Sequence, residues 1–198
     1  SKRGTSLDRP AHESGDLPAN APNQDDPFWK KEAQVFGSIE DARKKIDGSA
    51  PVELWPIYQE FGTDENARKQ LVELLTSPAG QFVQTLYLGN NNLGALKEGE
   101  HSAAAWKELR NAFAHLENLS LLHIEDNSLS DDETRKIFRA FAGTPTPLFI
   151  RCDNDHAVRP FLYTLVRKRW QIFSDPPTPG HFFASLVGQK GCQNFIAR

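Results

Sequence analysis

The 198 residues are poor in sulfur, with two cysteines and no methionine. Cys152 and Cys192 are too few for the disulfide network that holds small secreted domains together, so we expect a reducing compartment. A single disulfide between them stays open as an alternative. Because not even the first residue is methionine, we expect the chain to be a processed form or an excerpt of a longer protein. That expectation leaves room for a catalytic domain outside these residues.

Long apolar stretches and a strong net charge are also missing. No run approaches the roughly 20 apolar residues that a helix needs to cross a bilayer. The charged N-terminus is not followed by the apolar segment of a signal peptide. A net charge of −3 and a pI near 6.1 give no general attraction to nucleic acid or to anionic lipid. We therefore expect no membrane contact and no nucleic-acid partner.

The sequence lacks the common motifs that bind metals or phosphates. It contains no C-x-x-C pair, no H-x-x-x-H pair and no EF-hand loop, which are the common spacings of zinc and calcium ligands. A phosphate-binding glycine motif and a serine nucleophile elbow are absent as well. We expect neither a metal nor a cofactor.

The chain divides into four segments by composition. Residues 1–27 are rich in Ser, Pro, Asn, Asp and Gly, cannot bury enough surface to offset their ordering entropy, and are predicted to be a disordered tail. Residues 28–80 carry apolar residues at helical spacing, with helix starts at Ser38 and at Thr63 or Asp64. We predict a helical N-terminal cap there, and a separate helical domain is the alternative.

One eleven-residue pattern occurs twice in the third segment, residues 81–175. It reads V-x-x-L-x-L-x-x-N-x-L from Val83 to Leu93 and L-x-x-L-x-I-x-x-N-x-L from Leu119 to Leu129. Both match the signature of a leucine-rich repeat. Each centre predicts a short strand with two apolar side chains in the core. Asn91 and Asn127 are predicted to lie in the turn after each strand, where an amide can satisfy backbone groups.

Helices are predicted to return the chain after each strand. Trp106, Leu109 and Phe113 recur at helical spacing, and a second helix begins with Ser130 as its cap. Further repeats are weaker. A third strand is predicted at 147–152 with Leu148 and Ile150 as its inward pair, followed by a helix at 158–165 and a fourth strand around 170–172. The first repeat is longer than the next, so residues 98–105 are predicted to be an inserted loop.

Residues 81–175 resemble the leucine-rich repeat family, most of all its ribonuclease-inhibitor-like members. The resemblance implies an α/β fold: a short leucine-rich-repeat solenoid with parallel strands, the N-terminal helical cap and a C-terminal helix or cap at 176–198. A linker remnant is the alternative for that last segment. Family members usually bind proteins on the concave face of the sheet. The resemblance therefore implies a protein–protein interaction module without enzymatic activity of its own.

The resemblance also assigns the residues that face a partner. Transferred to this sequence, Tyr87, His123 and Phe149 share one repeat position and Gly89, Glu125 and Arg151 share another, with Asn90 beside them. The contact residues are thus predicted to be Tyr87, Asn90, His123, Glu125, Phe149 and Arg151. The polar tail, helical cap and short repeat block are similar in outline to bacterial type III secreted effectors. That outline implies a host-protein partner, a role in virulence, and a location in the cytoplasm or inside a host cell.

Two alternative functions depend on other residues. Cys152 and His156 place a thiol and an imidazole four residues apart, which suggests a cysteine-dependent enzyme, although adjacent residues point in different directions and a catalytic pair usually needs a partner from elsewhere. A domain attached to an absent catalytic domain is a variant of that hypothesis. Arg159 and the basic run 167–169 form a cluster that suits phosphates, but such charges more often belong to a solvated helix end, where they complement the helix dipole.

Overall fold

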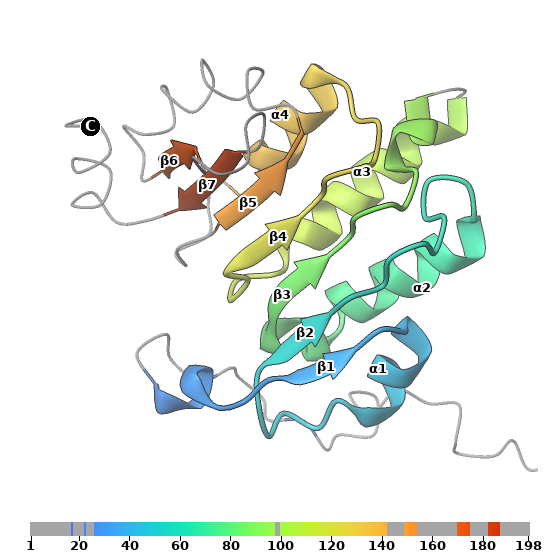
Figure 1. Ribbon diagram of the computed structural model, residues 1–198. Helices are drawn as coiled ribbons and strands as arrows, with labels where there is room; N and C mark the ends of the chain where they lie inside the picture. Colours follow the sequence, from blue (N-terminus) through green and yellow to red (C-terminus); the bar gives the residue numbers. More distant parts are fainter. Residues whose placement is uncertain are drawn as a thin grey trace, which may run out of the picture.

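The computed structural model describes residues 26–97, 100–141, 149–153, 170–174 and 182–186, together with residues 17 and 22. Its centre is one seven-stranded sheet in the order β1-β2-β3-β4-β5-β7-β6 (Figure 1). The first five strands are parallel and follow one another in the order of the sequence: β1 (Gln34–Phe36), β2 (Val52–Leu54), β3 (Val83–Tyr87), β4 (Leu121–His123) and β5 (Phe149–Cys152). The predicted α/β class with parallel strands is confirmed.

One helix lies between each pair of consecutive parallel strands: α1 (Ile39–Lys45), α2 (Glu65–Thr76), α3 (Glu100–Ala114) and α4 (Asp131–Ala140). Short 3-10 helices add η3 (Pro27–Lys30), η4 (Pro78–Phe82) and η5 (Leu93–Lys97). Helices α1–α4 gather on one side of the sheet, and no described α-helix covers the other side (Figure 1). We call that other side the helix-free face.

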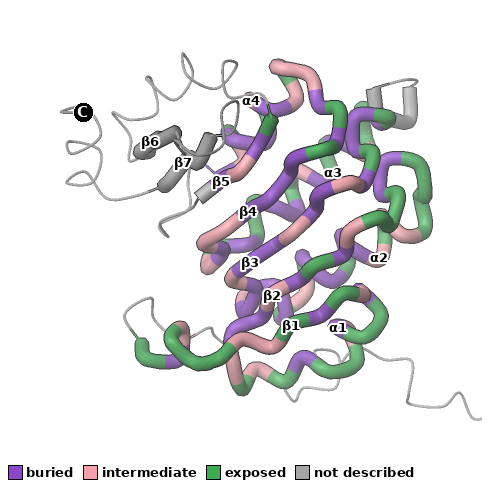
Figure 2. Tube along the Cα trace, in the orientation of Figure 1, coloured by how far each residue is buried: buried purple, intermediate pink, exposed green. Residues whose placement is uncertain are grey.

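The core lies between the sheet and the helices (Figure 2). One inward position of four consecutive strands is fully buried, at Leu54, Leu86, Leu122 and Ile150. Helices begin where the sequence predicts: the side chains of Ser38 and Asp64 accept hydrogen bonds from the first turns of α1 and α2. Ser130 and Glu133 form a reciprocal capping box at α4. No described helix is long and apolar enough to span a membrane.

The turns after β2, β3 and β4 have the same backbone shape. In each turn two residues with φ between 52° and 58° flank one central residue. The flanking pairs are Tyr58 and Glu60, Asn90 and Asn92, and Asp126 and Ser128. The central residues are Gln59, Asn91 and Asn127. Because non-glycine residues seldom adopt positive φ, three consecutive occurrences of the same pair show that one turn design is repeated along the sheet.

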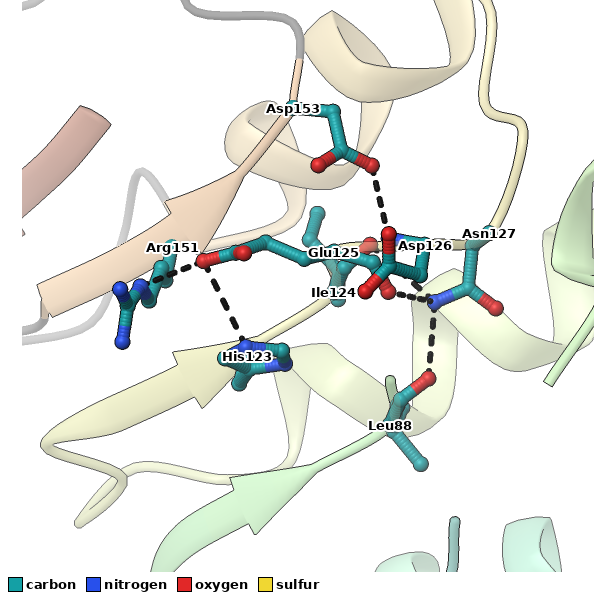
Figure 3. A network of polar contacts seen from close by, with 8 residues as sticks. All are labelled: Leu88, His123, Ile124, Glu125, Asp126, Asn127, Arg151 and Asp153. Carbon is teal, nitrogen blue, oxygen red and sulfur yellow. Dashed lines mark hydrogen bonds and ion pairs between the residues drawn. The ribbon is translucent and has the colours of Figure 1, made fainter. Parts of the chain in front are cut away.

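Asn127 joins its own turn to the preceding one. Its Oδ1 accepts hydrogen bonds from the backbone N–H groups of Asn91 (3.0 Å) and Leu93 (3.2 Å). Its Nδ2 donates to the carbonyl of Leu88 (2.8 Å) and to that of Glu125 (3.1 Å) (Figure 3). Only 1% of Asn127 is exposed, so the side chain replaces water for several buried backbone groups.

Asn91 repeats this arrangement one turn earlier. Its Oδ1 accepts from the N–H of Gln59 (2.8 Å), and its Nδ2 donates to the carbonyls of Pro56 (2.9 Å) and Gly89 (3.1 Å). The predicted turn role of both asparagines is confirmed, and we call Asn91 and Asn127 the asparagine ladder. The turns stack so closely that a Cβ atom on Gly94 would lie 2.2 Å from the carbonyl oxygen of Ser128.

The prediction that residues 28–80 are wholly helical is wrong at β1 and β2. Helices α1 and α2 are present, but Val52–Leu54 forms a strand between β1 and β3. Its apolar residues, extended by Trp55, Ile57 and Phe61, resemble a helical stripe. Pro56 stands inside that stripe, where a helix would lose a hydrogen bond and clash with the preceding turn. The segment instead buries Val52 and Leu54 on one side of a strand.

The prediction of an inserted loop at residues 98–105 is also wrong, because α3 begins at Glu100 and contains most of these residues. The extra length of this unit therefore lies largely in a longer helix. Among the later strands, the inward residue of β5 opposite Leu122 is Ile150 and not Leu148. The inward residues of the second and third units are thus 28 residues apart.

The C-terminal helix predicted within 176–198 is wrong at residues 182–186, because β7 (Phe182–Leu186) is a strand antiparallel to β5. An open edge of β5 would leave backbone groups unpaired, and β7 pairs with them. The strand predicted around 170–172 exists as β6 (Trp170–Ser174), but it pairs antiparallel with β7. The helix predicted at 158–165 and nearly all of the tail 1–27 lie outside the described residues.

The asparagine ladder generates a prediction about stability. We expect Asn127→Ala to lower the free energy of unfolding by about 2–4 kcal/mol, because it leaves several buried backbone groups without a partner. Asn111→Ala is the matched control, since Asn111 is exposed on α3 and alanine favours a helix. Urea denaturation followed by circular dichroism measures both. Equal stability of the two variants would contradict the structural role of the ladder.

Candidate binding surface

Three aromatic rings stack across the helix-free face of the sheet. Trp55, which follows β2, stacks on Tyr87 of β3 with ring centroids 4.1 Å apart and planes 5° apart. Tyr87 stacks in turn on His123 of β4 at 4.1 Å and 11°. Neighbouring strands lie about 4.8 Å apart, so side chains in register on one face meet at a stacking distance. We call Trp55, Tyr87 and His123 the aromatic row.

The exposure of the row falls from one end to the other. Trp55 is 38% exposed, Tyr87 is half-buried and His123 is 8% exposed. The indole at the β2 end therefore offers the most surface to a partner. The imidazole at the β4 end is enclosed by neighbouring residues, which fix its orientation.

A charged pair continues the row at its buried end. Arg151 lies opposite His123 in the register of β4 and β5, and its Nε forms an ion pair with Oε1 of Glu125. The same carboxylate oxygen lies 3.4 Å from Nε2 of His123 (Figure 3). Only 5% of Glu125 is exposed, and a buried carboxylate is stable only when it is paired. We call Glu125 and Arg151 the polar end of the row.

The turn residues beside the row support it in different ways. A Cβ atom on Gly89 would lie 3.1 Å from both Cε1 and Nδ1 of His123, so Gly89 leaves room for the imidazole. Asn90 is half-buried in the left-handed turn after β3. Asp153, after β5, accepts a hydrogen bond of 2.7 Å from the N–H of Asp126. The predicted contact residue Asn90 therefore lies at the edge of the row and not within it.

The structure corrects the predicted alignment of the third unit. Phe149 lies opposite Leu121, and Arg151 lies opposite His123, so Phe149 does not share the position of Tyr87 and His123. Likewise, Arg151 does not share the position of Gly89 and Glu125. Alternation with a period of two residues fits either assignment equally well. The burial of Ile150 and Cys152 identifies them as the inward pair.

Sequence reasoning missed Trp55, the most exposed member of the row. A signal for it was present: Leu54-x-Pro56-x-x-Gln59-x-Phe61 has the same spacing as Leu86-x-Leu88-x-x-Asn91-x-Leu93. Pro56 and Gln59 depart from the residue types of the repeat pattern and concealed the match. Aligned on that spacing, Trp55 falls at the position of Tyr87.

The residues of the enzymatic hypothesis are not brought together among the described residues. The side chain of Cys152 is buried, with 1% exposure, and its predicted partner His156 lies outside the described residues. A buried thiol in apolar surroundings lacks the access that a nucleophile needs. The described residues also contain no cluster of three or more His, Cys, Asp or Glu side chains that could hold a metal ion.

The carboxyl groups whose pKa values are clearly shifted lie away from the aromatic row. Side-chain hydrogen bonds from Lys44, Ser49 and Lys136 lower the pKa values of Glu40, Asp47 and Asp132, respectively. All three carboxylates are on the surface, so their pairs contribute little to stability. They give no sign of a second site that is tuned for acid–base chemistry.

The stacking in the row generates a prediction. In a double-mutant cycle on protein stability, Trp55→Ala and Tyr87→Ala should show a coupling energy of about 0.5–1.5 kcal/mol, which is typical of aromatic pairs. The control cycle combines Tyr87→Ala with Lys107→Ala, because Lys107 is exposed on α3 on the opposite side of the sheet and distant sites are additive. A Trp55–Tyr87 coupling no larger than the control coupling would disprove the stacking.

The chain was compared with known protein families, curated proteins and solved structures. No protein-family model matches the chain, and searches of curated proteins and of solved structures also found no match. The sheet, the repeated turns and the aromatic row are therefore the features that indicate a function.

Proposed function

We propose that this chain is a protein–protein interaction module whose units belong to the leucine-rich repeat type. Three features support a repeat architecture. Five parallel strands follow one another in the sheet with a helix between each pair. The turns after β2, β3 and β4 share one backbone shape. The asparagine ladder occupies the Asn position of the two strongest sequence repeats.

The aromatic row is the observation that carries the proposed binding function. It places Trp55, Tyr87 and His123 side by side on the helix-free face, which corresponds to the concave face of a leucine-rich repeat solenoid. Tryptophan, tyrosine and arginine are the residue types most enriched among binding hot spots. A surface that combines Trp55 and Tyr87 with Arg151 is therefore well suited to a protein partner.

Preorganisation strengthens this argument. The rings of the row support one another, and the polar end holds His123 in place. Side chains that are already ordered lose little conformational entropy when a partner binds. The row thus offers an anchor of fixed shape, with exposed indole at one end and a charged pair at the other.

The polar tail, the N-terminal cap and the short repeat block are similar in outline to secreted bacterial effectors, so we propose that the partner is a host-cell protein. The geometry of the row does not depend on that setting, because a partner in the source cell would use the same face. The enzymatic alternative has less support, since the thiol of Cys152 is buried. We therefore propose binding through the helix-free face as the function of the described residues.

Affinity capture tests this function. The wild-type chain, used as bait in lysates of eukaryotic cells and of the source cell, is expected to retain a protein. The Trp55→Ala/Tyr87→Ala double variant should bind that protein at least about tenfold more weakly, because hot-spot truncations cost about 2 kcal/mol or more each.

Tyr58→Asn is the matched control for this capture. Tyr58 is 68% exposed in the turn after β2, and asparagine tolerates its positive φ. The control thus removes an exposed aromatic ring without touching the row. Undiminished binding by a folded double variant, as judged by circular dichroism, would refute the assignment of the binding face.

A further inference from the structure

The aromatic row stops one strand short of the edge of the sheet. One face of the Trp55 ring is covered by Tyr87 at 4.1 Å. Because the two planes are nearly parallel and β1 lies on the other side of β2 from β3, the opposite face of the indole points toward β1, the edge strand. Leu54 lies opposite Phe36, and the N–H of Trp55 donates to the carbonyl of Phe36 (2.8 Å). The next position of the row, directly after β1, therefore belongs to Gly37.

Gly37 leaves this position of the row empty. A Cβ atom built on Gly37 would have no heavy atom within 4 Å, so the space above it is open. Gly37 also has no positive φ, and its backbone does not require glycine. Trp55 is 38% exposed, in agreement with an indole face that the described residues leave uncovered.

A carboxylate stands at the edge of the indole ring, next to its open face. Oε2 of Glu53 accepts a hydrogen bond of 3.2 Å from Nε1 of Trp55, and no described residue forms an ion pair with it. Val35 lies opposite Glu53 in the register of β1 and β2 and is 61% exposed. The gap is therefore bordered by an aromatic face, an anionic group and an apolar side chain.

The other end of the same row shows which group suits such surroundings. There, Arg151 occupies the position next to His123 and pairs with the carboxylate of Glu125. At the β1 end, Trp55 also presents a ring face, and Glu53, two residues before it, supplies a carboxylate, whereas Glu125 stands two residues after His123. Gly37 stands at the position that corresponds to Arg151. A cation over the indole would gain a cation–π contact and a charge-assisted hydrogen bond together.

We propose that the gap above Gly37 receives an arginine side chain of the protein partner. Its guanidinium lies on the free face of Trp55 and pairs with Glu53, while its aliphatic stem lies on Val35. Arginine fits better than lysine because its planar guanidinium both stacks on an aromatic ring and binds a carboxylate through two donors. This inference rests on the proposed binding function of the helix-free face and identifies one residue that the partner contributes.

Titration with a short peptide tests the inference. The probe is the blocked tripeptide acetyl-Gly-Arg-Gly-amide, and the control replaces arginine by citrulline, which has nearly the same shape without the charge. The signal is the indole N–H resonance of Trp55, assigned with the Trp55→Phe variant. The arginine peptide should shift this resonance at millimolar concentration, and the citrulline peptide should not. No shift, or equal shifts with both peptides, would overturn the proposal.

Two variants locate the effect in the gap. Glu53→Gln keeps the hydrogen-bond acceptor and removes the charge, so the arginine peptide should bind roughly two- to five-fold more weakly, as expected for the loss of an exposed ion pair. Gly37→Leu fills the gap with a side chain of this chain and should abolish the arginine-dependent shift while the other resonances keep their positions. Full binding of the arginine peptide by folded Gly37→Leu would place the arginine elsewhere and contradict the proposal.

The same two variants separate this inference from the proposed function. When a partner is captured through Trp55 and Tyr87, Gly37→Leu and Glu53→Gln should weaken its binding as well. If both variants bind that partner as the wild type does, the arginine site is wrong and the binding function stands. If the Trp55→Ala/Tyr87→Ala variant binds undiminished, the binding face itself is wrong.

Discussion

The hydrogen bonds of Asn91 and Asn127 are the constraint on which the described fold depends. Each buried amide satisfies backbone groups of two consecutive turns at once. The chain can therefore leave one strand, pass through residues with positive φ and stack closely on the preceding turn without losing buried hydrogen bonds. Leucine and isoleucine side chains fill the space behind the turns, but apolar burial is non-directional. The side-chain amides fix how consecutive turns are oriented, because their oxygen and nitrogen atoms accept and donate hydrogen bonds only in set directions.

The regular turns also determine how side chains are arranged on the helix-free face of the sheet. Strands that begin and end in register bring equivalent outward residues to the distance between strands, and at one position those residues are Trp55, Tyr87, His123 and Arg151. The aromatic row is thus a by-product of the same register that builds the core. The proposed function follows from this geometry, since a rigid row of anchors on an open face suits a protein partner more than a small substrate.

Sequence patterns predicted the parts of the structure in which side-chain chemistry is strict. The asparagines of the ladder, the serine caps and the inward leucines each need one residue type at one position, so the two strong repeats were recognisable. The unit around β2 was missed because Pro56 and Gln59 replace the expected types while the backbone keeps the same turn. At β5, Leu148–Ile150 and Ile150–Cys152 alternate equally well, and only burial decides between them. Trp55 and the true partner of His123 were hidden for these two reasons.

Footprinting of the wild-type chain bound to its captured partner tests the central claim most directly. Hydroxyl radicals would be applied to the free and the bound chain, and the oxidation of each side chain would be compared by mass spectrometry. The account predicts that Trp55 and Tyr87 lose reactivity on binding, while exposed side chains of α2 and α3 react as before. Protection of α2 and α3 with unchanged Trp55 and Tyr87 would place the partner on the helices and contradict binding through the helix-free face.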